Sequence, residues 1–296
     1  MSIRARSASE PLPFRLWAYL LERFPPVAYT LLVTLFAGSL FALVGEVGDV
    51  PVSLGVEIRA ALVVLLVFFH LRIMDEHKDE AGDKASYPER LLTRGVVTLP
   101  LLARCGVIAV VLQAALSLSI SLSAFAAWAG ALVFTLLMKV EFGFGAWLNR
   151  HLVVYAITHN PIVGFLAIFL WAVSGAEWNG LYGVYVVAVS FGSLAFELGR
   201  KIRSSDEEIV GVESYSSVLG RKRADILLIF VRWLATASVM VLALSLDNVV
   251  VAGLALVFAL GVHGALMWIA RKAKAVEGVA TLALLSDFLL VWGLAW

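Results

Sequence analysis

Charge and cysteine are both scarce in this sequence. Its 296 residues include one cysteine, Cys105, and only 15% of the residues are charged, against 61% that are hydrophobic. Soluble domains have about 25% charged and about 45–50% apolar residues, so the composition excludes an ordinary soluble fold. A lone cysteine can form neither an intramolecular disulfide nor a thiolate zinc site. The 23 basic and 22 acidic residues leave a net charge of +1, which argues against nucleic acid as a partner.

Long apolar runs fill most of the chain. A helix needs about 17–25 apolar residues to cross a bilayer. Nine runs approach this length, at residues 27–45, 54–71, 96–116, 122–138, 152–175, 180–198, 224–245, 248–269 and 276–296. The fourth is the weakest, because it is short and rich in glycine and alanine. We therefore predict an all-α polytopic membrane protein with nine transmembrane helices, in which residues 1–296 form a single integral-membrane domain.

The first 26 residues have a different character. They carry Arg4, Arg6, Arg15 and Arg23, with several prolines, before any apolar run begins. The apolar core of a cleavable signal peptide is therefore missing from this stretch. We expect residues 1–26 to form an amphipathic segment at the membrane interface.

The basic residues are concentrated on one side of the nine-span topology. If the N-terminus is cytoplasmic, only Arg59 lies on the opposite side. Because Lys and Arg are enriched in cytoplasmic loops, this pattern predicts a multi-pass protein with a cytoplasmic N-terminus. The two most charged loops, after the second and sixth spans, are then cytoplasmic as well.

The loop after the second span is rich in carboxylates. Asp75, Asp79 and Asp83 recur every four residues, so they share one stripe if the helix continues outward, although Gly82 places Asp83 on a loop. Like charges at this spacing repel one another. Mg²⁺ ions shared with substrate phosphates would neutralise them, whereas the alternative is a merely solvated loop. Arg90 and Arg94 follow, and their guanidinium groups suit a metal-bridged diphosphate.

The loop after the sixth span mixes both charges. Glu197, Arg200, Lys201 and Arg203 precede residues 206–208, which are all acidic. This set is able to hold a second metal ion and phosphate oxygens. Arg221, Lys222 and Arg223 are interpreted instead as anchors of the seventh span.

Polar residues also occur inside the spans. Tyr155 and His159 lie four residues apart on one face of the fifth span, and Asn160-Pro161 should kink it towards a cavity. They either line an acceptor or cation pocket or satisfy the kinked backbone. Asp287, in the ninth span, must face the protein interior, and we expect a basic partner for it.

Together these residues resemble the UbiA superfamily of intramembrane prenyltransferases. The family's first motif, Asn-Asp-x-x-Asp-x-x-x-Asp, is similar to Asp75, Glu76, Asp79 and Asp83, with two substitutions that keep oxygen ligands. Its Arg-Pro-Leu-x-x-Gly stretch is similar to residues 88–95, with Leu91 where the family has proline. A later similarity runs over Gly211-Val212-Glu213-Ser214, Gly220 and Arg223-Ala224.

The second aspartate motif of the family is altered here. Alignment on Gly211 puts Arg203 at its first aspartate and Glu207 at its second. Either Glu197, Glu207 or Glu208 supplies a replacement oxygen ligand, or Arg203 takes the phosphate charge directly.

The resemblance implies a bundle around a central, lipid-accessible cavity and a Mg²⁺-dependent reaction. An isoprenoid diphosphate ionises, and a hydrophobic acceptor, aromatic or lipidic, captures the allyl cation. The predicted roles are metal binding by Asp75, Glu76, Asp79, Asp83, Glu197 and Glu207; catalysis by Asp75, Asp79, Asp83, Lys78 and Arg90; diphosphate binding by Arg94, Arg200, Lys201 and Arg203; and an acceptor or cation pocket of Tyr155, His159 and Asn160.

Two other functions remain open at this stage. A terpene cyclase of the UbiA type would ionise the same substrate and close the cation on its own chain, without an acceptor. A divalent-cation carrier would use the carboxylates without any reaction, but its site would be expected at mid-membrane in broken helices.

Overall fold

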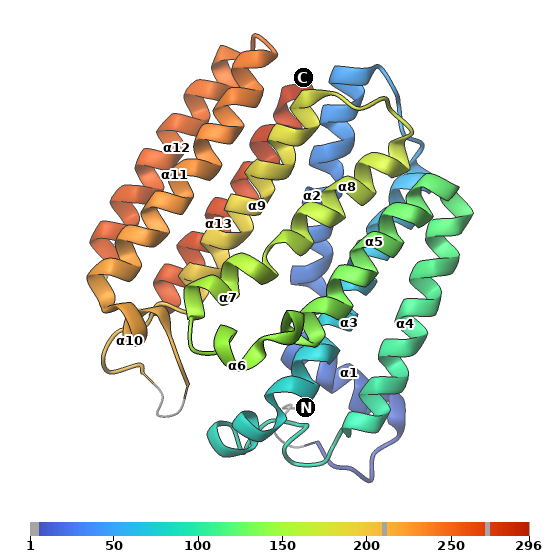
Figure 1. Cartoon of the computed structure of the whole chain (residues 1–296), viewed down its shortest axis with the longest axis vertical. Coiled ribbons are helices and arrows are strands. Elements are labelled where there is room, and N and C mark those ends of the chain that lie inside the picture. The colour runs from blue at the N-terminus through green and yellow to red at the C-terminus, as the bar shows by residue number, and fades with distance from the viewer. Residues whose placement is uncertain (1–5, 209–211, 270–272, 296) are drawn as a thin grey trace.

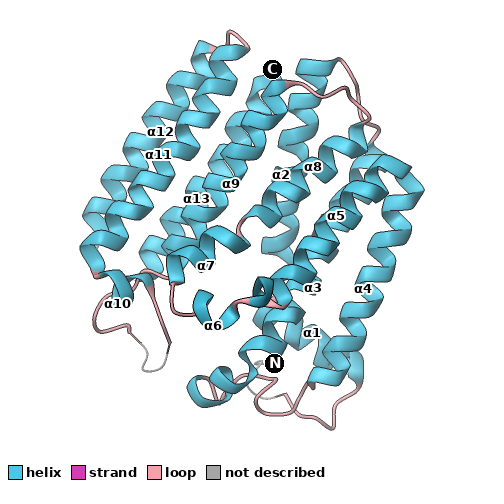
Figure 2. Cartoon of the chain, in the orientation of Figure 1, coloured by secondary structure: helices cyan, strands magenta, loops and turns pink. Residues whose placement is uncertain are grey.

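A computed structural model describes residues 6–208, 212–269 and 273–295 of the chain. Those residues form helices joined by short loops, with no strand among them (Figure 2). The helices are α1 (Leu12–Arg23), α2 (Pro26–Gly48), α3 (Leu54–Ser86), α4 (Leu99–Ile120), α5 (Leu122–Lys139), α6 (Gly145–Leu148), α7 (Leu152–His159), α8 (Pro161–Ser174), α9 (Gly180–Arg200), α10 (Tyr215–Leu219), α11 (Arg221–Ser245), α12 (Val249–Ile269) and α13 (Ala273–Trp292), with 3₁₀ turns η2 (Glu141–Gly143) and η3 (Gly293–Ala295).

The prediction of nine spans is confirmed for the described part of the chain. Nine helical segments there are long and apolar enough to cross a membrane, with α7 and α8 together making one of them. The weak fourth run is a complete helix, α5. The protein is thus a polytopic all-α membrane protein.

Proline marks several helix starts. Pro26 and Pro161 begin α2 and α8. The first position of a helix tolerates proline because its backbone N–H would have no intrahelical partner there. At Pro161 the missing N–H divides the fifth span into α7 and α8, as the sequence predicts.

The spanning helices close into a ring. Successive contacts lead from α2 through α3, α4, α5, α8, α9, α11, α12 and α13, and α13 packs back against α2. In Figure 1, α1, α6, α10 and the C-terminal end of α3 lie together at the lower end of this bundle. Most of the charged residues of the chain are therefore gathered at one end.

Helix α3 extends well beyond its apolar span. It continues without a break to Ser86, so Asp83 lies in the helix and the expectation that Gly82 places it on a loop is wrong. Salt bridges hold this extension, including one between Lys84 and Glu80 at 2.7 Å. The added turns carry the acidic stripe from the bundle to its charged end.

Buried polar side chains join helices inside the bundle. Gln113 on α4 contacts His70 on α3 at 3.0 Å and accepts a hydrogen bond from Trp128 on α5 at 3.0 Å. On the other side, Arg232 of α11 forms a bidentate ion pair with Asp287 of α13, the basic partner expected for this aspartate. Both contacts satisfy polar groups that would be costly to bury alone.

Candidate active site

A cavity of about 340 Å³ lies inside the ring of helices. Its walls come from α2, α3, α7, α8, α9 and α13. Four phenylalanines, Phe36, Phe68, Phe196 and Phe288, line its apolar part. Its charged lining residues are Arg72, Asp75, Glu197 and Arg200. The cavity thus combines an aromatic interior with a charged region, which suits a ligand with a hydrocarbon tail and an ionic head.

On the α3 side, Asp75 lines this space with an open carboxylate, whereas Asp79 is not among the lining residues. The side chain of Asp75 is 57% exposed and its ion pair with Arg72 is long, at 3.8 Å. Asp79 follows one helical turn later and is also exposed. Both are free to take a new ligand.

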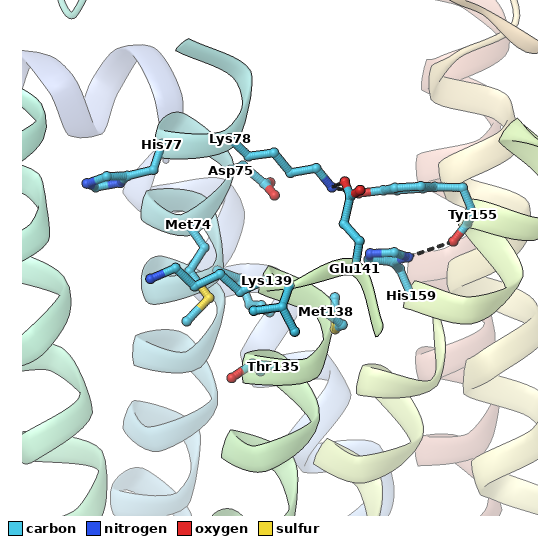
Figure 3. Close-up of a pocket in the computed structure, with 12 residues that line it drawn as sticks. Met74, Asp75, His77, Lys78, Thr135, Met138, Lys139, Glu141, Tyr155 and His159 are labelled. Atoms are coloured by element: carbon cyan, nitrogen blue, oxygen red, sulfur yellow. Dashed lines mark hydrogen bonds and ion pairs between the residues drawn. The ribbon is translucent and has the colours of Figure 1, made fainter. Parts of the chain in front are cut away.

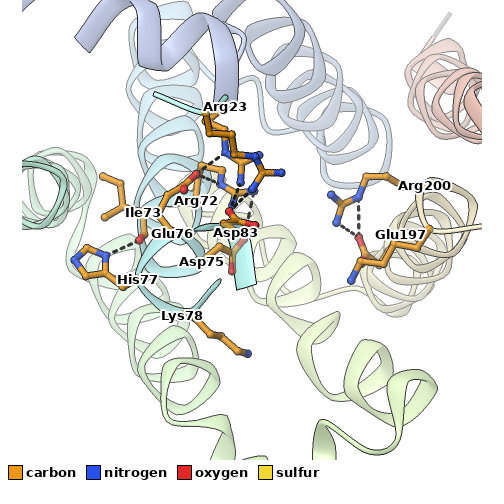
Figure 4. A network of polar contacts seen from close by, with 12 residues as sticks. Arg23, Arg72, Ile73, Asp75, Glu76, His77, Lys78, Asp83, Glu197 and Arg200 are labelled. Atoms are coloured by element: carbon orange, nitrogen blue, oxygen red, sulfur yellow. Dashed lines mark hydrogen bonds and ion pairs between the residues drawn. The ribbon is translucent and has the colours of Figure 1, made fainter. Parts of the chain in front are cut away.

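The other two acids of the predicted motif are already paired with arginines. Glu76 is 1% exposed and accepts a hydrogen bond from Arg23 at 2.6 Å, with Arg72 a second ion-pair partner at 3.2 Å. Asp83 pairs with Arg90 and lies 3.7 Å from Arg23 (Figure 4). Neither acid lines the central cavity. These contacts tie α1 and the loop after α3 to the acidic stripe.

The arginines of that loop have protein partners of their own. The guanidinium of Arg90 stacks on Tyr87 at 3.8 Å, besides its pair with Asp83. Arg94 donates to the carbonyl of Arg6 at 2.8 Å and is exposed. Neither side chain lines the central cavity, although both lie at the charged end of the bundle.

Two charged residues of α1, Glu22 and Arg23, are partly buried, and their pKa values are shifted. Burial alone would lower the pKa of Arg23, but the hydrogen bond to Glu76 and the charge of that carboxylate raise it overall. Burial raises the pKa of the Glu22 carboxyl, although the Leu91 N–H donates a hydrogen bond to it at 3.1 Å. Arg23 is therefore a permanent cation beside the acidic stripe.

The opposite wall of the cavity belongs to α9. Arg200 donates to Glu197 at 2.6 Å, and Lys201 contacts the same carboxylate at 2.9 Å. Figure 4 shows this pair across the open space from Asp75. Because one acid is flanked by two cations, the cluster of Glu197, Arg200 and Lys201 has a net charge of +1, and it faces Arg72 and Asp75 of α3 across the cavity.

A second cavity, of about 370 Å³, adjoins the first. Asp75, Tyr155 and His159 line both, and the second adds Lys78 and Glu141 (Figure 3). Lys78 donates to the Tyr155 hydroxyl and lies 2.5 Å from a Glu141 carboxylate oxygen. The wall shared by the two cavities is therefore a polar one.

The shared wall holds an oriented histidine. The rings of Tyr155 and His159 stack with their centroids 3.9 Å apart. His159 Nδ1 lies 2.9 Å from the Tyr155 carbonyl oxygen, which can only accept, so this nitrogen carries the hydrogen. Nε2 is buried without a hydrogen-bond partner.

Asn160 lines the central cavity but is also tied to α9. It donates to the Ser190 carbonyl at 2.7 Å and accepts from the Ser193 hydroxyl at 2.6 Å. These bonds tie the α7–α8 junction to α9.

The loop after α9 places its charged residues outside the central cavity. The backbone N–H of Arg203 donates to Ser216, and the Ser204 hydroxyl donates to Glu207 at 2.5 Å. Glu208 accepts from Ser214 and Ser216, each at 2.7 Å. Gly211, on which the motif alignment rests, lies outside the described residues. Neither Arg203 nor Glu207 is among the cavity's lining residues.

No cage of three or more acidic, histidine or cysteine side chains for a metal occurs in residues 6–208, 212–269 and 273–295. Mg²⁺ usually binds through one or two carboxylates, with waters and substrate phosphates completing its shell. Asp75 and Asp79, open and one turn apart, supply that smaller set. The donor oxygens therefore fit a Mg²⁺ ion that is shared with a phosphate ligand.

Three charged residues near the site had no assigned role in the sequence prediction. Arg72 lines the central cavity, Glu141 lines the second one, and Arg23 pairs with Glu76. Glu141 could have been noticed as the one acid between the fourth and fifth spans. Arg23 gave no such indication, because its partner is 53 residues away.

Comparison with solved structures finds the same fold in three proteins. A UbiA homologue from Aeropyrum pernix K1, in its apo form, superposes with a TM-score of 0.67 and 17% identity, over 90% of this chain and 96% of that one. A UbiA homologue from Archaeoglobus fulgidus bound to DMAPP and Mg²⁺ gives a TM-score of 0.64 and 14% identity, over 93% and 99%. A digeranylgeranylglyceryl phosphate synthase gives 0.61 and 16%, over 95% and 99%.

This chain therefore has the UbiA fold. By sequence alone, neither a protein-family model nor a curated protein matches it. The resemblance noted in the motifs is thus confirmed at the level of the fold.

Proposed function

We propose that the protein is a Mg²⁺-dependent intramembrane prenyltransferase that ionises an isoprenoid diphosphate and transfers the prenyl group to a hydrophobic acceptor. The observation that carries this proposal is the central cavity, where Asp75 faces Arg200 and four phenylalanines line the apolar part. A diphosphate head suits the charged region, and an isoprenoid chain suits the aromatic one. The UbiA homologue that binds DMAPP and Mg²⁺ supports the same ligand class for this fold.

We place the ion on Asp75 and Asp79, within reach of the diphosphate. When bound, Mg²⁺ supplies Lewis-acid neutralisation of the leaving diphosphate. Arg200 and Lys201 bind phosphate oxygens from the α9 side, and Lys78 approaches from the second cavity. Arg90 and Arg94 remain proposed diphosphate contacts, which would require Arg90 to exchange its bond with Asp83.

The reaction breaks the allylic C–O bond, whose electron pair leaves with the diphosphate. The allyl cation then lies among Phe36, Phe68, Phe196 and Phe288, whose ring faces stabilise positive charge. The acceptor forms the new bond to carbon and loses a proton to Nε2 of His159. The Tyr155 carbonyl holds the histidine tautomer that allows this transfer.

Two features support transfer over cyclisation. The second cavity opens on the same Asp75, Tyr155 and His159 wall, which leaves room for a second substrate. His159, which lines both cavities, is the base that we propose beside that room. A cyclase would need only the central cavity. We further propose that residues 1–296 act as one domain, with the N-terminus and the site on the cytoplasmic side.

The test is Mg²⁺-dependent diphosphate release by the purified protein, with geranyl, farnesyl and geranylgeranyl diphosphates. We expect Asp75→Asn to lower release about 100-fold or more, because one of two proposed metal ligands is lost. Asp247→Asn is the matched control. Asp247 lies at the opposite end of the bundle, and its φ of 54° is one that asparagine tolerates.

The products separate the remaining functions. Transfer requires release to depend on an added lipid or aromatic acceptor, whereas a cyclic terpene formed without acceptor would establish the cyclase. Ion flux in liposomes without diphosphate release would establish the carrier instead. Full activity of Asp75→Asn would contradict the shared mechanism of both enzymes.

A further inference from the structure

The α9 wall of the central cavity contributes one carboxylate among the described residues, and that carboxylate is already neutralised. Arg200 donates to Oε2 of Glu197 through Nε at 3.1 Å and Nη2 at 2.6 Å. Lys201 Nζ lies 2.9 Å from Oε1. Two cations and one anion leave this cluster with a net charge of +1. Its oxygens are occupied, so it is poorly suited to hold a metal ion.

The acids that follow α9 do not replace it. Glu207 accepts from Ser204, and Glu208 accepts from Ser214 and Ser216. None of these side chains lines the central cavity, and Arg203 does not line it either. The cation that does face the cavity from this side is Arg200.

The α3 wall has the opposite character. Asp75 is 57% exposed, with one long ion pair, and Asp79 is exposed beside it. The two sides of the ligand space therefore differ: α3 presents the open carboxylate of Asp75 beside Arg72, which is paired with Glu76, whereas α9 presents a cluster with a net charge of +1 (Figure 4). An anionic diphosphate bound between them meets a metal site on one side and a guanidinium on the other.

We infer that this site binds a single divalent cation per diphosphate, on Asp75 and Asp79, and that Arg200 with Lys201 binds the diphosphate oxygens on the α9 side in place of a second ion. Glu197 is then a positioning residue, which holds Arg200 towards the cavity and keeps Lys201 beside it. The inference rests on the proposed function, because it takes the ligand to be a diphosphate. A planar guanidinium suits this role, since it can donate two hydrogen bonds to one phosphate.

The first experiment measures how many metal ions bind to each chain, and it does not depend on enzyme turnover. The full chain in lipid nanodiscs is titrated with Mn²⁺ in the presence of geranyl thiolodiphosphate, whose sulfur bridge resists ionisation, and bound Mn²⁺ is measured by electron paramagnetic resonance. We expect one Mn²⁺ per chain in the wild type and still one in Glu197→Gln. Two ions in the wild type, with one lost in Glu197→Gln, would overturn the inference.

A second measurement gives the affinity for the same thiolodiphosphate. Arg200→Ala should weaken binding about 10- to 100-fold through loss of a charge-assisted contact, and Arg200→Lys should weaken it less. Lys222→Ala, a charge removal at an exposed position on α11, should leave the affinity and the ion count unchanged. Unaltered affinity in Arg200→Ala would also overturn the inference.

The outcomes distinguish this inference from the proposed function. If the wild type binds no thiolodiphosphate with Mn²⁺ present, the proposed function fails and the inference fails with it. If the ligand binds with two ions, only the inference fails. If it binds with one ion and Arg200→Ala weakens it, both stand.

Discussion

At the scale of single residues, Glu22 connects stability to pH. Burial raises the pKa of its carboxyl, so the folded protein holds that proton more tightly than the unfolded chain does. Folding stability therefore falls as the pH rises from the carboxyl's ordinary pKa through the raised value, and the loss persists at neutral pH.

We expect Glu22→Gln to raise the melting temperature at pH 7 by about 2 °C, because glutamine is uncharged and still accepts from the Leu91 N–H. The difference from the wild type should shrink below the ordinary pKa of a glutamate. Melting curves in detergent, recorded from about one pH unit below the ordinary pKa of a glutamate up to neutral pH, measure this. Glu213→Gln, at an exposed site, is the control, and an equal rise there would contradict the explanation.

The residue scale also indicates how far sequence analysis reaches. The four-residue spacing correctly puts Asp75 and Asp79 on one side of a helix. A helix turns about 100° per residue, so Glu76 points elsewhere and Asp83 has rotated by about 80° from Asp75. Both meet arginines, and Arg23 is 53 residues from Glu76 in the chain. Local periodicity contains no information about such partners.

At the scale of elements, the connection between α5 and α7 supplies Glu141 to the lining of the second cavity. Glu141 and Phe142 have φ values of 49° and 54°, which are unusual for residues with side chains. A Cβ atom on Gly145 would lie 1.9 Å from a Glu141 carboxylate oxygen. The absence of a side chain at Gly145 therefore allows Glu141 to reach Lys78.

We expect Gly145→Ala to displace the Glu141 carboxylate and lower diphosphate release about tenfold, while the fold persists because alanine favours helix. Glu141→Gln should lower release to a similar extent. Gly130→Ala, with open space around the added carbon, is the control. Unchanged release in Gly145→Ala, alongside a loss in Glu141→Gln, would show that the turn accommodates the methyl group.

Elements were easier to predict than this contact was. Hydropathy alone predicted all nine spans, because backbone groups in a bilayer must be paired within each helix. It ended the second span at residue 71, whereas α3 continues to Ser86. The extension is polar, so hydropathy does not detect it. The four-residue spacing of the aspartates is compatible with a longer helix but does not require one. The irregular turn at Glu141 and Phe142 has no periodic pattern at all.

At the scale of the whole molecule, a buried ion pair links α11 to α13. The side chains of Arg232 and Asp287 are 7% and 9% exposed. We expect Asp287→Ala to destabilise the protein by about 3–5 kcal/mol, because it leaves a buried guanidinium without its partner. The double variant Arg232→Met with Asp287→Leu should recover most of this loss. Thermal or denaturant unfolding in detergent measures the stability of both variants. An equal loss of stability in the double variant would contradict the explanation that an unpaired buried charge destabilises Asp287→Ala.

The charge distribution predicts the orientation of the bundle, and this prediction can be tested with the chain's single cysteine removed. A Cys105→Ala background carries either Ser9→Cys, beside α1, or Glu177→Cys, in the exposed loop between α8 and α9. In Figure 1, α1 lies at the lower end of the bundle and the connection between α8 and α9 lies at the upper end. Because basic residues are retained on the cytoplasmic side, an impermeant maleimide added to intact cells should label position 177 and not position 9. Permeabilised cells provide the control, since both positions should then react. The reverse pattern would place Asp75, Asp79 and Arg200 on the outer side, where a diphosphate substrate would have to be supplied from outside the cell.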